Sequence, residues 1–116
     1  MKSVVLTVAA LGALALGFPG TAAAATSFEV CSPLGCAAQS VRGTVDQGRV
    51  MATVSDSSPG SALTADFTVY PQGVSTRVIV DDEVKQLVLT LPPGAARLTV
   101  TACGGGGCNS KSIPLS

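Results

Sequence analysis

The chain contains no histidine and no tryptophan, and aromatic residues make up only 3% of its 116 positions. Without histidine, the Ser–His and Cys–His pairs that activate many protein nucleophiles cannot form. Charged residues amount to 12%, are scattered, and balance to a formal net charge of zero. We therefore expect no basic surface of the kind that binds nucleic acid. Because large aromatic side chains are so few, the core must be built from Val, Leu, Ile and Ala.

Paired carboxylates are the remaining route to acid–base catalysis. The candidates are Asp81, Asp82 and Glu83, which are consecutive in a short polar connection. Neighbouring side chains on a strand or turn point apart, so we interpret this segment as a solvated turn, with a loose calcium site as the functional alternative. The glycine run Gly104–Gly107 lacks the lysine and the helix of a phosphate-binding loop. The sequence therefore predicts a protein that is not an enzyme and that requires no cofactor.

The first 25 residues have the pattern of an export signal. Lys2 precedes an apolar run from Val4 to Leu16, and small residues end at Ala25. This pattern predicts a secretory signal peptide over residues 1–25, cleaved after Ala25 or, alternatively, after Ala24. The apolar run is shorter than the roughly 20 residues that span a bilayer. We expect a single secreted domain over residues 26–116, extracellular or in the cell envelope, with no membrane attachment after cleavage.

Four cysteines form two matched segments, Cys31-Ser-Pro-Leu-Gly-Cys36 and Cys103-Gly-Gly-Gly-Gly-Cys108. In an exported chain this pattern predicts disulfides. A cysteine at each end of a four-residue loop lies where cross-strand partners come within disulfide reach, so we predict Cys31–Cys36 and Cys103–Cys108. The two crossed connectivities are the alternatives. A metal site is not expected, because zinc ligands are usually spaced more closely and histidine is absent.

After the leader, hydrophobic residues alternate with polar ones, which is the period of a strand with one buried face. Residues Leu63 to Tyr70 show the alternation most clearly, and no later stretch keeps a helical period. Turn residues recur about every ten positions. The predicted strands are Phe28 with Val30, 39–45, 50–54, 63–70, 74–81, 84–91, 98–102 and 110–115. The sequence therefore predicts an all-β antiparallel sandwich of two sheets, with seven or eight short strands and two short-loop disulfides.

Several of these segments occur in an order that is similar to that of a known domain family. Asp66-Phe-Thr-Val-Tyr-Pro-Gln-Gly precedes Val84–Leu91, the corner Pro92-Pro93-Gly94 and Leu98-Thr-Val-Thr-Ala102. From about Val45 to Leu115 the chain thus resembles a fibronectin type III domain, in which a leucine ends one strand before a proline-glycine corner. The core tryptophan and corner tyrosine of that family are absent, so an immunoglobulin-like sandwich is the alternative. The resemblance implies an extracellular interaction or spacer module without catalytic residues.

Three functions fit these observations. The first is a secreted, non-catalytic binding or structural module of a bacterium, whose loops contact an extracellular protein or a cell-wall component. The second is a protease inhibitor that presents the Cys31–Cys36 loop with Leu34 at its tip. The third is a small-ligand carrier, because the chain is similar in size and disulfides to the immunoglobulin-like apoproteins that carry chromophores. The predicted contact residues are Pro33, Leu34, Gly105 and Gly106.

Overall fold

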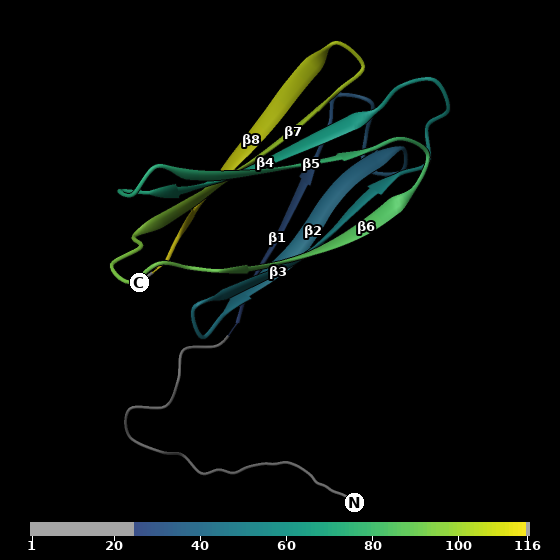
Figure 1. The fold of residues 1–116 in the computed structure, drawn as a ribbon. Helices are drawn as coiled ribbons and strands as arrows, with labels where there is room; N and C mark the ends of the chain where they lie inside the picture. The colour runs from purple at the N-terminus through teal and green to yellow at the C-terminus, as the bar shows by residue number, and fades with distance from the viewer. Residues whose placement is uncertain (1–24, 116) are drawn as a thin grey trace, which may run out of the picture.

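A computed structural model describes residues 25–115, and within them the chain forms eight strands and no helix (Figure 1). The predicted leader lies outside the described residues, apart from Ala25. The strands are β1 (Thr26–Cys31), β2 (Gln39–Asp46), β3 (Arg49–Asp56), β4 (Leu63–Tyr70), β5 (Val74–Val80), β6 (Val84–Thr90), β7 (Arg97–Gly104) and β8 (Gly107–Pro114). Over this range no helix is long and apolar enough to cross a membrane.

The strands form two four-stranded antiparallel sheets that face each other (Figure 1). The first sheet has the order β1-β2-β3-β6, and the second has the order β5-β4-β7-β8. The chain crosses between the sheets after β3, after β5 and after β6. The predicted all-β fold with two antiparallel sheets is confirmed, and so is the number of strands at its upper value.

The alternating sequence places one face of each strand in the core. In β4, Leu63, Ala65, Phe67 and Val69 are buried, and the residues between them are partly or fully exposed. The facing strands supply β-branched and aliphatic side chains, as the low aromatic content requires. The core consists of Phe28, Val30, Val41, Val50, Ala52, Val54, Leu63, Ala65, Phe67, Val69, Val80, Leu98, Val100, Ala102 and Ile113.

Phe28 is one of the two aromatic residues in this core, and it needs a glycine opposite it. Phe28 pairs in register with Gly43 on β2. A Cβ built on Gly43 would lie 2.7 Å from the Phe28 Cζ atom, so the ring lies across the space that a side chain would occupy. Cross-strand packing of an aromatic ring over a glycine is a known way to fix strand register. Gly43 is therefore required by the packing of the first hairpin.

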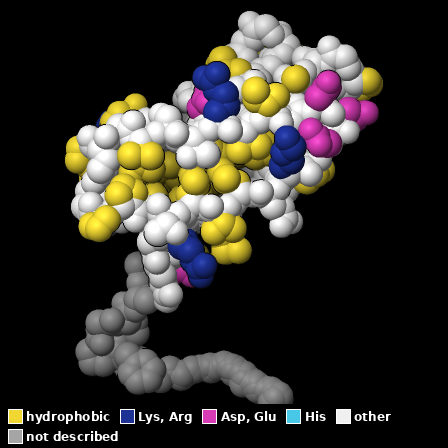
Figure 2. Space-filling view, viewed as in Figure 1, with side chains coloured by type: hydrophobic (Ala, Val, Ile, Leu, Met, Phe, Trp, Pro, Cys, Tyr) yellow, Lys and Arg dark blue, Asp and Glu magenta, His cyan; other side chains and the backbone are white. Residues whose placement is uncertain are grey.

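The sandwich is less well covered on one side. β5 and β6 are edge strands that lie on the same side of the molecule, and β6 contributes no fully buried side chain to the core. Leu87 and Leu89 face inward as expected but are only half-buried. Val74 also faces inward yet is 52% exposed. Figure 2 shows hydrophobic side chains reaching the surface between the two sheets.

Both cysteine segments lie at the same end of the sandwich, opposite to the end at which β1 begins and β8 finishes (Figure 1). Four connections meet there: residues 32–38, 57–62, 81–83 and 105–106. We call this region the cysteine end. Because loops on a rigid scaffold commonly carry binding functions, it is the first place to look for a site.

Candidate functional site

The first cysteine segment folds into a tight turn. Gly35 N donates a hydrogen bond to Ser32 O at 2.9 Å, so Pro33 and Leu34 occupy the two central positions of a β-turn. Proline suits this position because its φ is already fixed near the required value. Gly35 has φ +100°, which favours glycine. The predicted Cys31–Cys36 disulfide is confirmed and closes this turn, with 4.9 Å between the two Cα atoms.

This first loop differs from the hairpin geometry expected for it. Cys31 pairs in register with Ser40, and Cys36 lies within the seven-residue connection between β1 and β2. The disulfide therefore joins the end of a strand to the middle of a loop, and not two facing strand residues. The equal cysteine spacing concealed this difference, because spacing alone does not say how many further residues belong to the loop.

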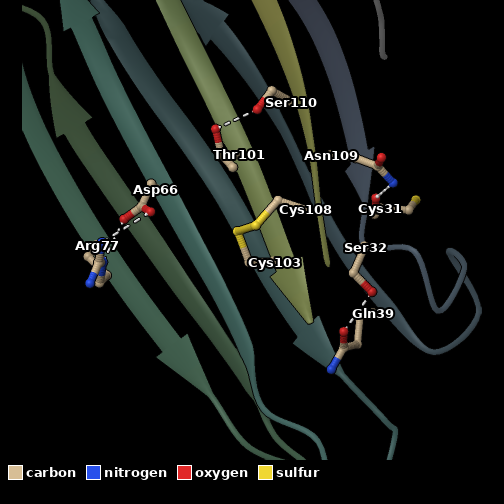
Figure 3. Close-up of a disulfide and its surroundings, with 10 residues drawn as sticks. All are labelled: Cys31, Ser32, Gln39, Asp66, Arg77, Thr101, Cys103, Cys108, Asn109 and Ser110. Atoms are coloured by element: carbon tan, nitrogen blue, oxygen red, sulfur yellow. Dashed lines mark hydrogen bonds and ion pairs between the residues drawn. A yellow bond between two sulfur atoms is a disulfide. The ribbon is translucent and has the colours of Figure 1, made fainter. Parts of the chain in front are cut away.

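The second cysteine segment is a hairpin of the expected kind. Cys103 and Cys108 are direct cross-strand partners on β7 and β8, and their disulfide is confirmed, with 4.0 Å between the Cα atoms (Figure 3). Gly104 and Gly107 still belong to the strands, which leaves Gly105 and Gly106 as a two-residue turn. Their φ angles of +66° and +87° fit the type I′ turn that favours glycine. β8 consequently begins at Gly107, earlier than the predicted Ser110.

The two loops are in contact with each other. A Cβ built on Gly105 would lie 2.6 Å from Leu34 Cδ2 and 2.7 Å from Leu34 Cγ. A Cβ on Gly107 would lie 3.1 Å from Pro33 Cγ. The Pro33-Leu34 turn therefore packs on the glycine hairpin at positions where a larger residue would collide. The structure brings the four predicted contact residues, Pro33, Leu34, Gly105 and Gly106, to one surface, which we call the paired-loop surface.

A buried polar network lies beneath this surface. Ser32 Oγ donates to Gln39 Oε1 at 2.6 Å, and Gln39 Nε2 donates to Ser61 O at 2.8 Å and to Asp56 Oδ1 at 3.3 Å (Figure 3 shows the Ser32–Gln39 bond). Gln39 and Asp56 are almost completely buried. The backbone of Gly104 packs directly against the Gln39 amide. A Cβ on Gly104 would overlap that amide, so this position requires glycine. Buried polar groups of this kind rigidify a structure when all of them have partners.

Asp56 extends the network to the remaining connections of the cysteine end. Its carboxylate accepts hydrogen bonds from Ser58 N at 2.8 Å and from Asp82 N at 3.3 Å, besides the bond from Gln39. Gly105 N donates to Ser61 Oγ at 3.2 Å. The four connections are therefore tied together through three buried side chains, Ser32, Gln39 and Asp56, and through the backbone carbonyl and hydroxyl of Ser61. The paired-loop surface has a fixed base and does not depend on its disulfides alone.

Asn109 joins the two sheets next to the site. It lies on β8 immediately after Cys108, and its Nδ2 donates to Cys31 O at 2.8 Å (Figure 3). Since Cys31 is on β1, the bond closes the side of the sandwich formed by β1 and β8. The two disulfide-bonded segments are thus connected by a second contact besides that of Leu34 with Gly105.

One rim of the cysteine end is acidic. Asp81, Asp82 and Glu83 form the β5–β6 turn and are exposed, and Figure 2 shows acidic side chains gathered at this end of the molecule. Asp82 has φ +51°, and Lys85 Nζ lies 3.7 Å from Glu83 Oε2. The segment is a turn, as predicted. One acidic residue and two cysteines, Glu29, Cys31 and Cys36, have potential ligand atoms within 4.8 Å of one another. Their sulfurs are bonded to each other, so no thiolate is present to hold a metal ion.

The outer face of the second sheet carries an ion pair between Arg77 and Asp66. Arg77 Nε donates to Asp66 Oδ1 at 2.8 Å across β4 and β5 (Figure 3). This hydrogen bond, together with the negative charge of Asp66, raises the pKa of the Arg77 guanidinium above its ordinary value. On the same face, Thr101 and Ser110 share a hydrogen bond of 2.8 Å. In each pair the two side chains satisfy each other's hydrogen bonds, so neither pair suggests a reactive site.

Two hollows lie away from the cysteine end. One, of about 500 Å³, crosses the outer face of the first sheet and presents Met51 and Val88 beside the ion pair of Glu29 with Arg42. The other, of about 470 Å³, lies at the opposite end of the sandwich, between the β2–β3 turn and the segment that follows β6. Its apolar lining includes Val45, Leu91, Ala95 and Leu115.

Sequence reasoning missed the residues that support the site: Gln39, Asp56, Ser61 and Asn109. Asp56 carries a local signal, because an aspartate that precedes serine in a turn often accepts a bond from the amide two residues later, as it does from Ser58. The other contacts join segments far apart in the chain and leave no local pattern.

The comparisons with known proteins assign no family. No family model matches the chain, and no curated protein or solved structure matches it.

Proposed function

We propose that this protein is a small secreted binding module, without catalytic activity, that recognises an extracellular protein or a cell-wall component through its paired-loop surface. The observation that supports the proposal most directly is the contact between Leu34 and Gly105, which joins two disulfide-closed loops into one surface. Leu34 is 43% exposed even in that position, so it offers a partner an apolar group.

Preorganisation is the physical basis of this proposal. Ordering a flexible loop on binding costs free energy, and a loop that is already fixed avoids that cost. Here the loops are closed by disulfides, and the Gln39–Asp56 network supports them from below. The side chains that contribute most to a protein interface lie in well-packed positions, surrounded by contacts that exclude water. The glycine hairpin adds exposed backbone groups next to Leu34.

The strand order supports a fibronectin type III-like assignment within the sandwich class. In an immunoglobulin constant-type sandwich, strands A, B, E and D form one sheet and C, F and G form the other. Here β2, β3 and β6 correspond to A, B and E, and β4, β7 and β8 correspond to C, F and G. β5 joins the second sheet, as the corresponding strand does in fibronectin type III domains. β1 is an additional strand at the start.

The inhibitor alternative receives less support from the geometry. A segment that binds a protease cleft as a substrate does is extended, so that its backbone can pair with the enzyme. Leu34 lies instead in the centre of a tight β-turn, and part of its side chain is covered by the glycine hairpin. The ligand-carrier alternative is supported by the hollow at the opposite end, which has a partly apolar lining. That hollow has no aromatic side chain in its lining on which a flat ligand could stack.

The proposal is tested by capture experiments with a matched pair of variants. The oxidised protein is immobilised and exposed to culture supernatant and envelope extract of the exporting bacterium. Leu34→Asp places a charge on the paired-loop surface, and Met51→Asp places the same charge on an exposed apolar residue of the outer face of β3. If Leu34 is an anchor, its substitution should weaken binding of the captured partner by about 30-fold or more, since anchors contribute about 2 kcal/mol.

Two results would contradict the proposal. Equal binding by the wild-type protein and Leu34→Asp would exclude Leu34 as an anchor. A loss of binding by Met51→Asp alone would move the site to the outer face of the first sheet. A reduced and alkylated sample of the wild-type protein completes the set, and it should bind less tightly because its loops are no longer closed.

A further inference from the structure

Both lysines among residues 25–115 lie on edge strands. Lys85 is on β6, at the edge of the first sheet, and Lys111 is on β8, at the edge of the second. The two sides of the sandwich each have one edge strand from each sheet, β5 with β6 and β1 with β8. One lysine is therefore present on each side.

The register shows that both lysines point toward the core. Lys85 is the direct cross-strand partner of Val54, and Lys111 is the direct partner of Val100. Direct partners project from the same face of a sheet, and Val54 and Val100 are completely buried. Both positions are thus inward-facing positions at which an apolar residue would continue the core. Each lysine is nevertheless exposed, because it lies at the rim.

Lys85 shows where such a side chain goes. Its Nζ donates to Ile79 O at 3.0 Å, so the chain extends from β6 across the side of the sandwich to the end of β5. The charged group thereby lies across the opening between the two edge strands. On the outward face of β6, Val84 and Val88 are 60% and 57% exposed. Apart from Lys85, β6 carries no charged residue.

An edge strand with unpaired backbone groups and exposed β-branched side chains is a template for pairing with another chain. Inward-pointing charged residues, lysine above all, are a recognised means of preventing this, because pairing would bury the charge. We propose that Lys85 and Lys111 keep the β6 and β8 edges from pairing with a second copy of this chain. The partner that they exclude is the protein itself, through edge-to-edge extension of its sheets.

The effect of net charge on self-association is opposite to that of edge protection, so the two can be distinguished by experiment. Without Lys2 of the leader, six basic residues stand against seven acidic ones. Replacing a lysine with threonine therefore moves the net charge further from zero, and this alone should reduce association. Edge protection predicts more association after the same substitution. The two effects have opposite signs.

The experiment uses protein purified after expression of the full chain with its leader. Lys85→Thr, Lys111→Thr and the double variant are compared with Arg42→Thr, which makes the same change of charge on the outward face of the central strand β2. Lys85→Arg retains the charge. Mass is measured by light scattering over a hundredfold range of concentration, and far-UV circular dichroism at the lowest concentration verifies the fold.

The wild-type protein, Lys85→Arg and Arg42→Thr should remain monomeric. The lysine-to-threonine variants should at least double in mass as concentration rises, most strongly in the double variant, while keeping the native spectrum when dilute. Monomeric threonine variants at every concentration would overturn the proposal. So would association of Arg42→Thr to the same extent, or association only in variants that have lost the native spectrum.

Discussion

At the scale of single residues, Asp56 and Gln39 hold most of the polar contacts of the cysteine end. Gln39 uses its amide oxygen and nitrogen at the same time, and Asp56 accepts three hydrogen bonds. Groups so deeply buried depend on these partners, since an unpaired buried donor costs about 1 to 3 kcal/mol. Each of the two side chains therefore has more influence on the site than its distance from the surface suggests.

Replacing Asp56 tests this dependence. Asp56→Ala leaves Ser58 N and Asp82 N without their acceptor and removes one of the two acceptors of Gln39 Nε2. It should lower the free energy of unfolding by about 2 to 4 kcal/mol. Asp66→Ala is the matched control, because Asp66 is also a strand aspartate but pairs with the exposed Arg77. Exposed ion pairs contribute little, so its effect should be much smaller. Urea denaturation of both variants measures the difference, and equal losses would refute the role given to Asp56.

At the scale of elements, the two disulfides perform different tasks. Cys103–Cys108 joins two strands that are already paired by the β7–β8 ladder. Cys31–Cys36 closes a turn within a connection that has no ladder of its own. Loops of equal length should contribute equally to stability in the chain-entropy model, yet the consequences for local order should differ.

We expect the double variants Cys31→Ser with Cys36→Ser, and Cys103→Ser with Cys108→Ser, each to lose about 2 kcal/mol of stability. Only the first should greatly accelerate amide hydrogen exchange in residues 32–38, because that segment has few backbone hydrogen bonds of its own. Exchange at Gly105 N should also be faster in that variant, because the turn that packs on Gly105 would be less ordered. Exchange that changes equally in both variants would contradict the distinction.

Two edge strands, β6 and β8, differ from the central strands in the residues that face the core. β6 and β8 have inward positions where the period of the sequence calls for an apolar residue and the chain has lysine instead. Such a departure from the pattern is informative because it lowers the burial available to the strand. On the β5–β6 side of the sandwich, Leu87 and Leu89 are only half-buried and Val74 is exposed.

At the scale of the whole molecule, the two ends of the sandwich differ. The cysteine end holds four connections in one hydrogen-bonded network, whereas the opposite end holds the hollow of about 470 Å³ beside the first and last strands. Ala25 and Leu115 both lie at this opposite end, so anything attached through them would be at the far end from the paired-loop surface. This arrangement is suited to presenting the paired-loop surface to a partner.

Much of this architecture could be predicted from the sequence, because alternation is a local signal. The strands, their inward faces and both disulfides follow from period and spacing in segments such as Leu63–Tyr70 and Cys103–Cys108. The contact of Leu34 with Gly105 could not be predicted, since it joins residues from opposite ends of the chain. The requirement for glycine at position 104 could not be predicted either, because the group that it packs against, the amide of Gln39, is distant in the sequence.

A double-mutant cycle between Leu34 and Gly105 measures whether the two cysteine loops form one surface, on which the proposed binding role depends. Gly105→Ala should be destabilising in the wild-type background, because it strains a positive φ and collides with Leu34. Leu34→Ala should relieve the collision, so the double variant should be more stable than the sum of the single effects by about 1 kcal/mol or more. Gly106→Ala shares the positive φ but has no atom within 4 Å of its Cβ, and with Leu34→Ala it should be additive. Additive effects at Gly105, equal to those at Gly106, would show that the two loops do not touch and do not form one surface.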